Sequence, residues 1–366
     1  MGLLDRYRRF EELPDEEVSA RLRAQADERR RTALARIERL DLSRTTWPEY
    51  PPAAVVGAIA HAARSGLQRY TGQSGELRAR IGERHSVPPE RVAVGHGASQ
   101  LLGAAVQALC EPGDELLTHR PSYPLYPILA ARARARPVTV RGMRAKALLD
   151  KVTSRTRVLV LCNPNDPTGE LMAVDELRAL AEALPERVVV LLDEALRDFV
   201  DAERRDAALE LCASHPRLLA FRSFSKAWGL AGLRCGYAVG GPGSEWLLER
   251  LGPPLGIGEL AQVGALEALQ SAERIVARRV AHVASERERL HRTLRELSLE
   301  ALPSQASFLW IAAPGLEGAE LAARLRRRGI DVAPGGPLGD LRHVRAAVIG
   351  DEQTDRLLRA LTAELG

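Results

Sequence analysis

Lysine is nearly absent from this chain of 366 residues: only three of its 52 basic residues are lysines, and all the others are arginines. Arginine stays protonated at any workable pH, whereas a lysine amine can lose its proton and attack a carbonyl carbon. A lysine retained in such a background is therefore a candidate for a position that needs an amine. Lys146 and Lys151 lie in a polar stretch, where we expect them to be solvated. Lys226 lies among apolar residues and serines and is the candidate nucleophile.

Other absences narrow the class of protein. The net charge is only +4 and the basic residues are spread along the chain, so the sequence indicates no binding to nucleic acid. No apolar run approaches the roughly 18–20 residues of a membrane-spanning helix, and we expect no membrane partner. The charged start of the chain predicts no signal peptide, and hence a cytoplasmic protein. The four cysteines lack CxxC spacing, which favours buried, reduced thiols over a disulfide or a metal site.

The chain is long enough for two domains, and its pattern divides it into three parts. Residues 1–45 carry alternating charges at helical spacing and predict an exposed N-terminal helical arm. Over residues 46–250, short apolar runs alternate with helical patterns, and several runs are apolar throughout, as in strands buried on both faces. This part predicts an α/β domain with a mostly parallel, seven-stranded sheet and helices on both faces. Residues 251–366 predict a long connecting helix around Leu260–Leu299 and a small α+β domain.

The individual elements can be assigned from these runs. The expected strands of the large sheet are Arg91–Gly95, Glu115–His119, Pro137–Val140, Arg157–Cys162, Arg187–Asp193, Leu218–Ser223 and Cys235–Gly240. The expected elements of the small domain are strands Phe308–Ala312, Gly329–Val332 and Val344–Ile349 and helices Glu317–Arg328 and Glu352–Leu365.

Chemically distinctive residues follow the strands of the large sheet, where open α/β sheets bind their ligands. A glycine-containing turn at His96–Gln100 opens a helix and can hold an anion on its free N–H groups. It is a poor dinucleotide fingerprint, because a glutamine stands where the third glycine belongs, so a nicotinamide dehydrogenase is disfavoured. Tyr123 follows the next strand, Asp193 ends a third, and Ser223–Lys226 follows a fourth, with Arg234 eight residues beyond. Each feature alone also fits an ordinary turn or helix cap, but their combination indicates one site.

Three stretches are specific enough to indicate a family: Asn163–Gly169, Asp193–Ala195, and Ser223–Lys226 with Arg234. From about Leu40 to its end, the chain resembles the pyridoxal-phosphate-dependent class I/II aminotransferases of the aspartate aminotransferase fold, and most closely the histidinol-phosphate aminotransferase branch. The resemblance implies a fold type I enzyme with pyridoxal 5'-phosphate as cofactor and no metal. It also implies a homodimer.

The resemblance assigns a role to each motif residue. Lys226 would form a Schiff base with the cofactor aldehyde and move the substrate Cα proton. Asp193 would keep the pyridine nitrogen protonated, and Tyr123 would stack on the ring. The groups implied to bind the cofactor phosphate are Gly97, Ala98, Ser99, Ser223, Ser225, Arg234 and Tyr70 of the partner subunit. Arg345, which has Arg342 three residues before it, would bind the substrate carboxylate, and we expect Trp47 to form a pocket wall.

Three positions depart from the family pattern. Asp166 stands where the family has asparagine, and Leu196 where it has tyrosine. Both family side chains hydrogen-bond the cofactor's phenolic oxygen, so either the phenolate is disfavoured here or a nearby hydroxyl or water replaces them. Ala333 stands where histidinol-phosphate aminotransferases place a second arginine for the substrate phosphate. We therefore expect an amino acid whose α-carboxylate pairs with Arg345, and not histidinol phosphate.

The leading hypothesis is an aminotransferase acting between an L-amino acid and a 2-oxo acid. The alternative keeps the cofactor but is a decarboxylase, lyase, cyclase or oxidase of a specialised pathway, because protein groups select among the fates of one carbanion. A non-catalytic binding protein of the same fold would have lost Lys226 or Asp193, and both are present.

Overall fold

The structure describes part of the predicted N-terminal arm, and the end of that arm pairs with the small domain. The computed structural model describes residues 19–20, 22–29, 38–68, 70, 72 and 74–365. Residues 19–20 and 22–29 are helical and exposed, and the other residues of the predicted arm before residue 38 lie outside the described residues. Strand β1 (Leu40–Asp41) runs parallel to β11 (Ile330–Asp331), so the end of the predicted arm joins the small domain.

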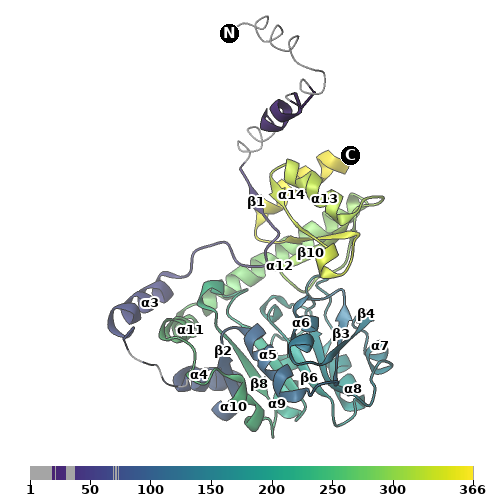
Figure 1. Cartoon of the computed structure of the whole chain (residues 1–366). Helices are drawn as coiled ribbons and strands as arrows, with labels where there is room; N and C mark the ends of the chain where they lie inside the picture. Colours follow the sequence, from purple (N-terminus) through teal and green to yellow (C-terminus); the bar gives the residue numbers. More distant parts are fainter. Residues whose placement is uncertain are drawn as a thin grey trace, which may run out of the picture.

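The described residues build the predicted seven-stranded sheet, which forms the centre of the large domain (Figure 1). In spatial order its strands are β2 (Val92–Gly95), β8 (Gly236–Gly240), β7 (Leu218–Ser223), β6 (Val189–Asp193), β5 (Thr156–Cys162), β3 (Glu115–Arg120) and β4 (Arg136–Arg141). Strand β8 is antiparallel to both of its neighbours, and the other pairs in the sheet are parallel. The prediction of a mostly parallel sheet is confirmed.

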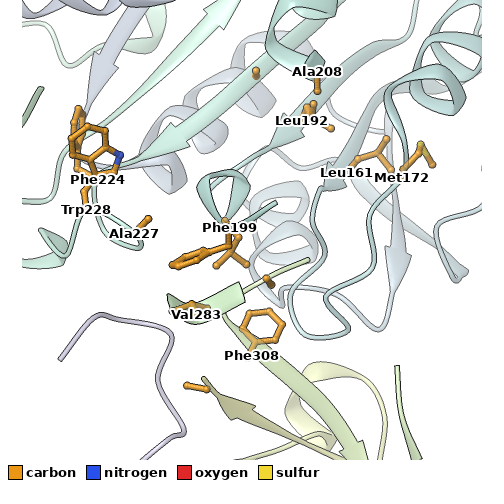
Figure 2. Close-up of a cluster of buried hydrophobic side chains, with 14 of the residues drawn as sticks. Leu161, Met172, Leu192, Phe199, Ala208, Phe224, Ala227, Trp228, Val283 and Phe308 are labelled. Carbon is orange, nitrogen blue, oxygen red and sulfur yellow. The ribbon is translucent and has the colours of Figure 1, made fainter. Parts of the chain in front are cut away.

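Helices cover both faces of this sheet because successive side chains of each strand point to opposite sides. Val158 and Val160 belong to a core shared with α5 (Ala98–Leu109), α6 (Leu125–Arg132) and α10 (Glu245–Leu251). Leu159 and Leu161 belong to the other core, with α8 (Val174–Ala183), α9 (Ala207–Ser214) and the longer α12 (Glu273–Glu296). Figure 2 shows part of this second core, where Leu161, Leu192 and Phe199 are labelled.

The predicted long connecting helix is two helices. Helix α11 (Glu259–Ser271) ends and α12 (Glu273–Glu296) begins at Ala272. Helix α11 packs beside α3 (Ala53–Ser65), while α12 continues to the small domain (Figure 1). A single straight helix could not make both contacts, so tertiary packing explains the break. Two further α-helices of the large domain are α4 (Gly75–His85) and α7 (Ala145–Leu149).

The small domain is an antiparallel sheet with helices α13 (Gly318–Arg327) and α14 (Asp351–Leu365). Its strand order is β12 (Ala333–Pro334), β13 (His343–Ala347), β10 (Phe308–Ala312) and β9 (Glu300–Ala301). The predicted strand Gly329–Val332 contains β11, and the next strand, β12, begins just beyond it and belongs to a different sheet. Because β12 pairs with β13, Ala333 lies directly opposite Arg345.

Two expectations from composition can be compared with this fold. All four cysteines are buried and free, as predicted. Among the described residues, no helix is long and apolar enough to cross a membrane.

Candidate active site

A cavity of about 170 Å³ lies where the central parallel strands end and α5 begins. Its lining comes from five of the segments that the sequence singled out, together with the loop before α3. The lining residues are Thr46, Ala98, Ser99, Tyr123, Cys162, Asp166, Asp193, Ala195, Leu196, Ser223, Ser225, Lys226, Ala231 and Arg234. Parallel pairing accounts for this convergence, because Cys162 lies opposite Asp193 and Asp193 opposite Phe221 at the ends of adjacent strands.

Lys226 is presented to the cavity by a segment whose apolar side chains are anchored in the core. Phe224 and Trp228 contact each other edge to face with ring centroids 5.4 Å apart, and Phe224, Ala227 and Trp228 are all buried (Figure 2). Burial lowers the pKa of the Lys226 amine, and the nearby Asp166 carboxylate opposes that shift. The Lys226 Nζ donates a hydrogen bond of 2.5 Å to the Oγ1 of Thr45. An amine with a lowered pKa is a better nucleophile and base near neutral pH.

Asp193 is a buried carboxylate at the end of β6. Its Oδ2 accepts a hydrogen bond of 2.9 Å from the Tyr126 hydroxyl, and its Oδ1 accepts one of 3.1 Å from the Ala195 N–H. Burial outweighs both hydrogen bonds and raises the pKa of Asp193 to about 6. A carboxylate in this setting gains from a cationic partner. Tyr126 was not predicted, and its only sequence signal is its position three residues after Tyr123 in the segment that forms α6.

The adjacent Glu194 does not line the cavity and forms a buried ion pair with Arg222. Its Oε2 accepts a hydrogen bond of 2.9 Å from the Arg222 Nε, and both side chains are buried. This ion pair joins the ends of β6 and β7, which carry Asp193 and Ser223.

Tyr123 and Asp166 are placed by two loops that share a buried amide. The Asn165 Oδ1 accepts hydrogen bonds of 2.9 Å from the Ser122 hydroxyl and 3.0 Å from the His119 ring, while its Nδ2 donates 2.8 Å to the Thr168 Oγ1. The two loops therefore hold each other in position beside the cavity.

The turn before α5 forms a cradle for an anion. Gly97 has φ +84°, and a Cβ there would lie 2.7 Å from the Arg234 Nη2, so only glycine leaves room for this approach. The first N–H groups of α5, at Ala98 and Ser99, have no intrahelical acceptor. Arg234 Nη1 donates 3.4 Å to the Ser225 Oγ, and the Ser225 N–H donates 3.0 Å to the Ser223 Oγ.

These groups fit pyridoxal 5'-phosphate. The cradle supplies N–H groups, hydroxyls and a guanidinium for a phosphate, and the buried Asp193 carboxylate suits a protonated ring nitrogen. Lys226 would supply the amine for the aldehyde, and Tyr123 would supply an aromatic face. Among the described residues there is no group of three or more histidines, cysteines, aspartates or glutamates that could hold a metal ion.

At the small-domain side of the cavity, Arg345 is paired with Asp166. The Arg345 Nη1 contacts the Asp166 Oδ1, and its Nη2 donates 3.0 Å to the Ser43 carbonyl oxygen. Arg342 instead forms an exposed ion pair of 2.8 Å with Glu300. Arg345, rather than Arg342, is therefore the arginine beside the site.

The structure also shows where three other residues singled out by the sequence lie: Leu196, Trp47 and Tyr70. Leu196 is buried and lines the cavity. Trp47 is outside the lining and lies under Arg279, whose guanidinium carbon is 4.3 Å from the ring centroid; its neighbour Thr46 lines the cavity instead. Tyr70 is 91% exposed and does not line the cavity of its own subunit.

The family model for aminotransferase class I and II matches residues 40–361. An aromatic amino acid aminotransferase of Corynebacterium efficiens is 36% identical over 332 residues, which are 89% of this chain and 92% of that protein. A histidinol-phosphate aminotransferase of Nitrosococcus oceani is 33% identical over 293 residues, 79% of each chain. Among solved structures, the histidinol-phosphate aminotransferase of Sinorhizobium meliloti in complex with pyridoxal 5'-phosphate has a TM-score of 0.80 at 27% identity, covering 92% of this chain and 94% of that one. The aspartate aminotransferase of Thermus thermophilus with maleate has a TM-score of 0.76 at 25% identity, covering 99% and 100%.

Proposed function

The chain belongs to the class I and II aminotransferases and is a pyridoxal-phosphate-dependent enzyme, and from this premise we propose that the cavity around Lys226 is its active site and that its amino donor is an aromatic L-amino acid. The observation that carries the site assignment is the convergence of Lys226, Asp193 and the cradle at Gly97 on one cavity.

Two observations support an aromatic donor. Curated relatives at 36% identity are named aromatic amino acid aminotransferases. Lys226 and Arg234 are the only cationic residues in the described cavity lining, and the cofactor accounts for both. A donor side chain that carries a second carboxylate would therefore find no free cation in this lining. The same reasoning and the neutral Ala333 disfavour a phosphorylated donor.

The mechanism follows from what each side chain can do. Pyridoxal phosphate, when bound, supplies an aldehyde that captures amino groups and a ring that withdraws electrons from the substrate Cα. The Lys226 amine would take the proton from the substrate Cα and deliver it to a different carbon, as amino transfer requires, and its lowered pKa favours the unprotonated amine that this role needs. Asp193 would bind a protonated ring nitrogen of the cofactor, and the Tyr126 hydroxyl orients that carboxylate. Arg345 orients the substrate by its carboxylate.

A homodimer with Tyr70 contributed across the interface is part of the same proposal. Helix α3 is rich in apolar residues but has only Val55 and Ala62 buried, and it stands out from the large domain beside α11 (Figure 1). Exposed apolar patches of this kind mark association surfaces. The exposed apolar residues on and near α3 and α11 are Tyr50, Val56, Leu67, Tyr70 and Leu255. The cytoplasmic location stays a prediction from the sequence.

Two measurements test the proposal. Borohydride reduction of the protein loaded with pyridoxal phosphate should attach the cofactor to Lys226, as read by peptide mass spectrometry, and labelling of no lysine or of another lysine would contradict the site. A screen of amino donors with 2-oxoglutarate should form glutamate fastest with phenylalanine, tyrosine or tryptophan. Release of carbon dioxide, ammonia or peroxide without glutamate would favour the alternative reactions.

A further inference from the structure

The position beside Arg345, where the substrate carboxylate is proposed to bind, already contains the carboxylate of Asp166. Asp166 and Arg345 are 179 residues apart in the chain, yet their side chains are only 8% and 12% exposed and in direct contact. Arg345 is the only cation within ion-pair distance of Asp166 among the described residues. The second terminal nitrogen of Arg345 is also engaged, by the carbonyl oxygen of Ser43.

The net charge of the Asp166–Arg345 pair is therefore close to zero. Arg345 contributes one positive charge and Asp166 one negative charge, whereas an asparagine at position 166 would leave the guanidinium uncompensated. The neighbouring strand adds no further cation, because Ala333 is the residue opposite Arg345. Electrostatic attraction inside a protein is far stronger than in water, so one cancelled charge matters at this depth.

A substrate carboxylate has two ways to reach Arg345, and both are unfavourable compared with an asparagine site. If it displaces Asp166, a buried carboxylate loses its cation, which is strongly destabilising. If Asp166 stays, two carboxylates share one guanidinium and repel each other. A neutral group of the same shape, such as a primary amide, meets neither difficulty.

We propose that Asp166 is a specificity-determining residue that, by neutralising Arg345, removes the enzyme's preference for a free α-carboxylate over a neutral carboxyl derivative. The substrate class then includes amino acids whose carboxyl group is amidated. This inference rests on the proposed site, and it extends the proposed function from the donor's side chain to its carboxyl end.

The test compares paired inert probes on the holoenzyme. The dissociation constants of 3-phenylpropionate and 3-phenylpropionamide, and of butyrate and butyramide, are measured by calorimetry or ligand-observed NMR for the wild type and for Asp166→Asn. We expect the wild type to bind each acid and its amide within about threefold of each other. Asp166→Asn should bind each acid at least about tenfold more tightly than its amide, the usual effect of one charge-assisted hydrogen bond.

Glu170→Gln is the matched control, because it removes a carboxylate from the same loop at an exposed position and leaves the ion pair intact. It should behave as the wild type. A wild type that already prefers the acids tenfold overturns the proposal without any variant, and so does an Asp166→Asn protein with unchanged ratios or no acid binding. The butyrate pair does not depend on an aromatic donor. Absence of turnover with aromatic amino acids alongside the expected ratios would therefore reject the proposed donor and retain the role of Asp166.

Discussion

Among single residues, Asp193 has a buried carboxyl group whose negative charge is unfavourable in the absence of a cationic partner. Burial raises its pKa from 3.8 to about 6, so in the cofactor-free protein the folded state holds a proton that the unfolded chain has already lost. Stability must therefore fall as the pH rises from about 4 to about 6, by on the order of 2–3 kcal/mol. Asp193→Asn should remove this loss, and the cofactor-free variant should be the more stable protein at pH 8 while losing aminotransferase activity.

Urea unfolding of the cofactor-free proteins at pH 4 and pH 8 measures this difference. Asparagine can keep both hydrogen bonds, because the Tyr126 hydroxyl can accept as well as donate. Asp150→Asn, at an exposed position, is the control and should change stability little at either pH. A stability difference of equal size at both pH values would show that Asp193 does not titrate in this window.

Thr45 gives a second prediction at this scale, because its hydroxyl accepts the hydrogen bond of the Lys226 amine. An acceptor stabilises the protonated amine and so opposes the lowering of the Lys226 pKa by burial. Thr45→Val should lower that pKa further, which moves the acidic limb of the pH dependence of kcat to lower pH by about one unit. The measurement is kcat against pH with a saturating amino donor.

Thr45→Ser is the discriminating control, since it keeps the hydroxyl and loses only a methyl group. Its pH profile should match the wild type. A Thr45→Val enzyme with a lower kcat but an unmoved acidic limb would assign Thr45 a packing role only.

How far the sequence predicts the site also depends on individual residues. Lys226 and Asp193 are recognisable because each lies directly beyond an apolar strand, and the arrangement of strand ends follows from local patterns. The partners of these residues are not recognisable in the same way. Thr45 lies 181 positions from Lys226, and Tyr126 lies 67 positions from Asp193. Those contacts depend on how loops and helices pack, which no local pattern specifies.

At the scale of elements, the turn that joins β2 to α5 is shaped by the approach of Arg234 to Gly97. Gly97→Ala adds a methyl group 2.7 Å from the guanidinium, so Arg234 must move away from the cradle. We expect the affinity for pyridoxal phosphate to fall at least about tenfold, as for the loss of one charge-assisted hydrogen bond. Equilibrium titration of the cofactor-free protein, followed by visible absorbance, gives the dissociation constant.

Gly113→Ala is a matched control for backbone strain. Gly113 has φ +93°, close to that of Gly97, but a Cβ there meets no atom within 4 Å. Both substitutions place an L-residue at a positive φ and should cost on the order of 1–3 kcal/mol of stability each. Only Gly97→Ala should weaken cofactor binding, and equal affinities in the two variants would contradict the role of the cradle.

The elements themselves were predictable to different degrees, for physical reasons. Strands such as Leu218–Ser223 and Phe308–Ala312 have the bounds predicted for them, because each is a short run of buried, mostly apolar residues. No glycine or proline at Ala272 marks the break in the sequence. We attribute the break to the contact of α11 with α3. The separation of β11 and β12 into two sheets likewise depends on β1, which pairs with β11 and comes from the other end of the chain.

At the scale of the whole molecule, the loop that follows β1 connects both domains at the site. β1 pairs with β11 in the small domain, the Ser43 carbonyl accepts a hydrogen bond from Arg345, and the Thr45 hydroxyl contacts Lys226 of the large domain. The position of the small domain relative to Lys226 is thus coupled to this loop. Aminotransferase active sites of this arrangement need both domains, so separate expression of either one should give no activity.

The proposed dimer makes a prediction that only a shared site can satisfy. Tyr70 is 91% exposed in its own subunit, whereas Lys226 lies in the cavity. If Tyr70 serves the partner's site, a mixed dimer of Lys226→Ala and Tyr70→Ala subunits contains one site with both residues intact. Mixing two impaired variants at random should then restore about a quarter of wild-type activity, because half of the dimers are mixed and each has one working site.

The assay is activity after co-refolding or co-expression, with each variant alone as its control and the dimer mass verified. If Tyr70 acts in its own subunit or not at all, the mixture shows only the mean of the two variants, and the assignment across the interface is wrong.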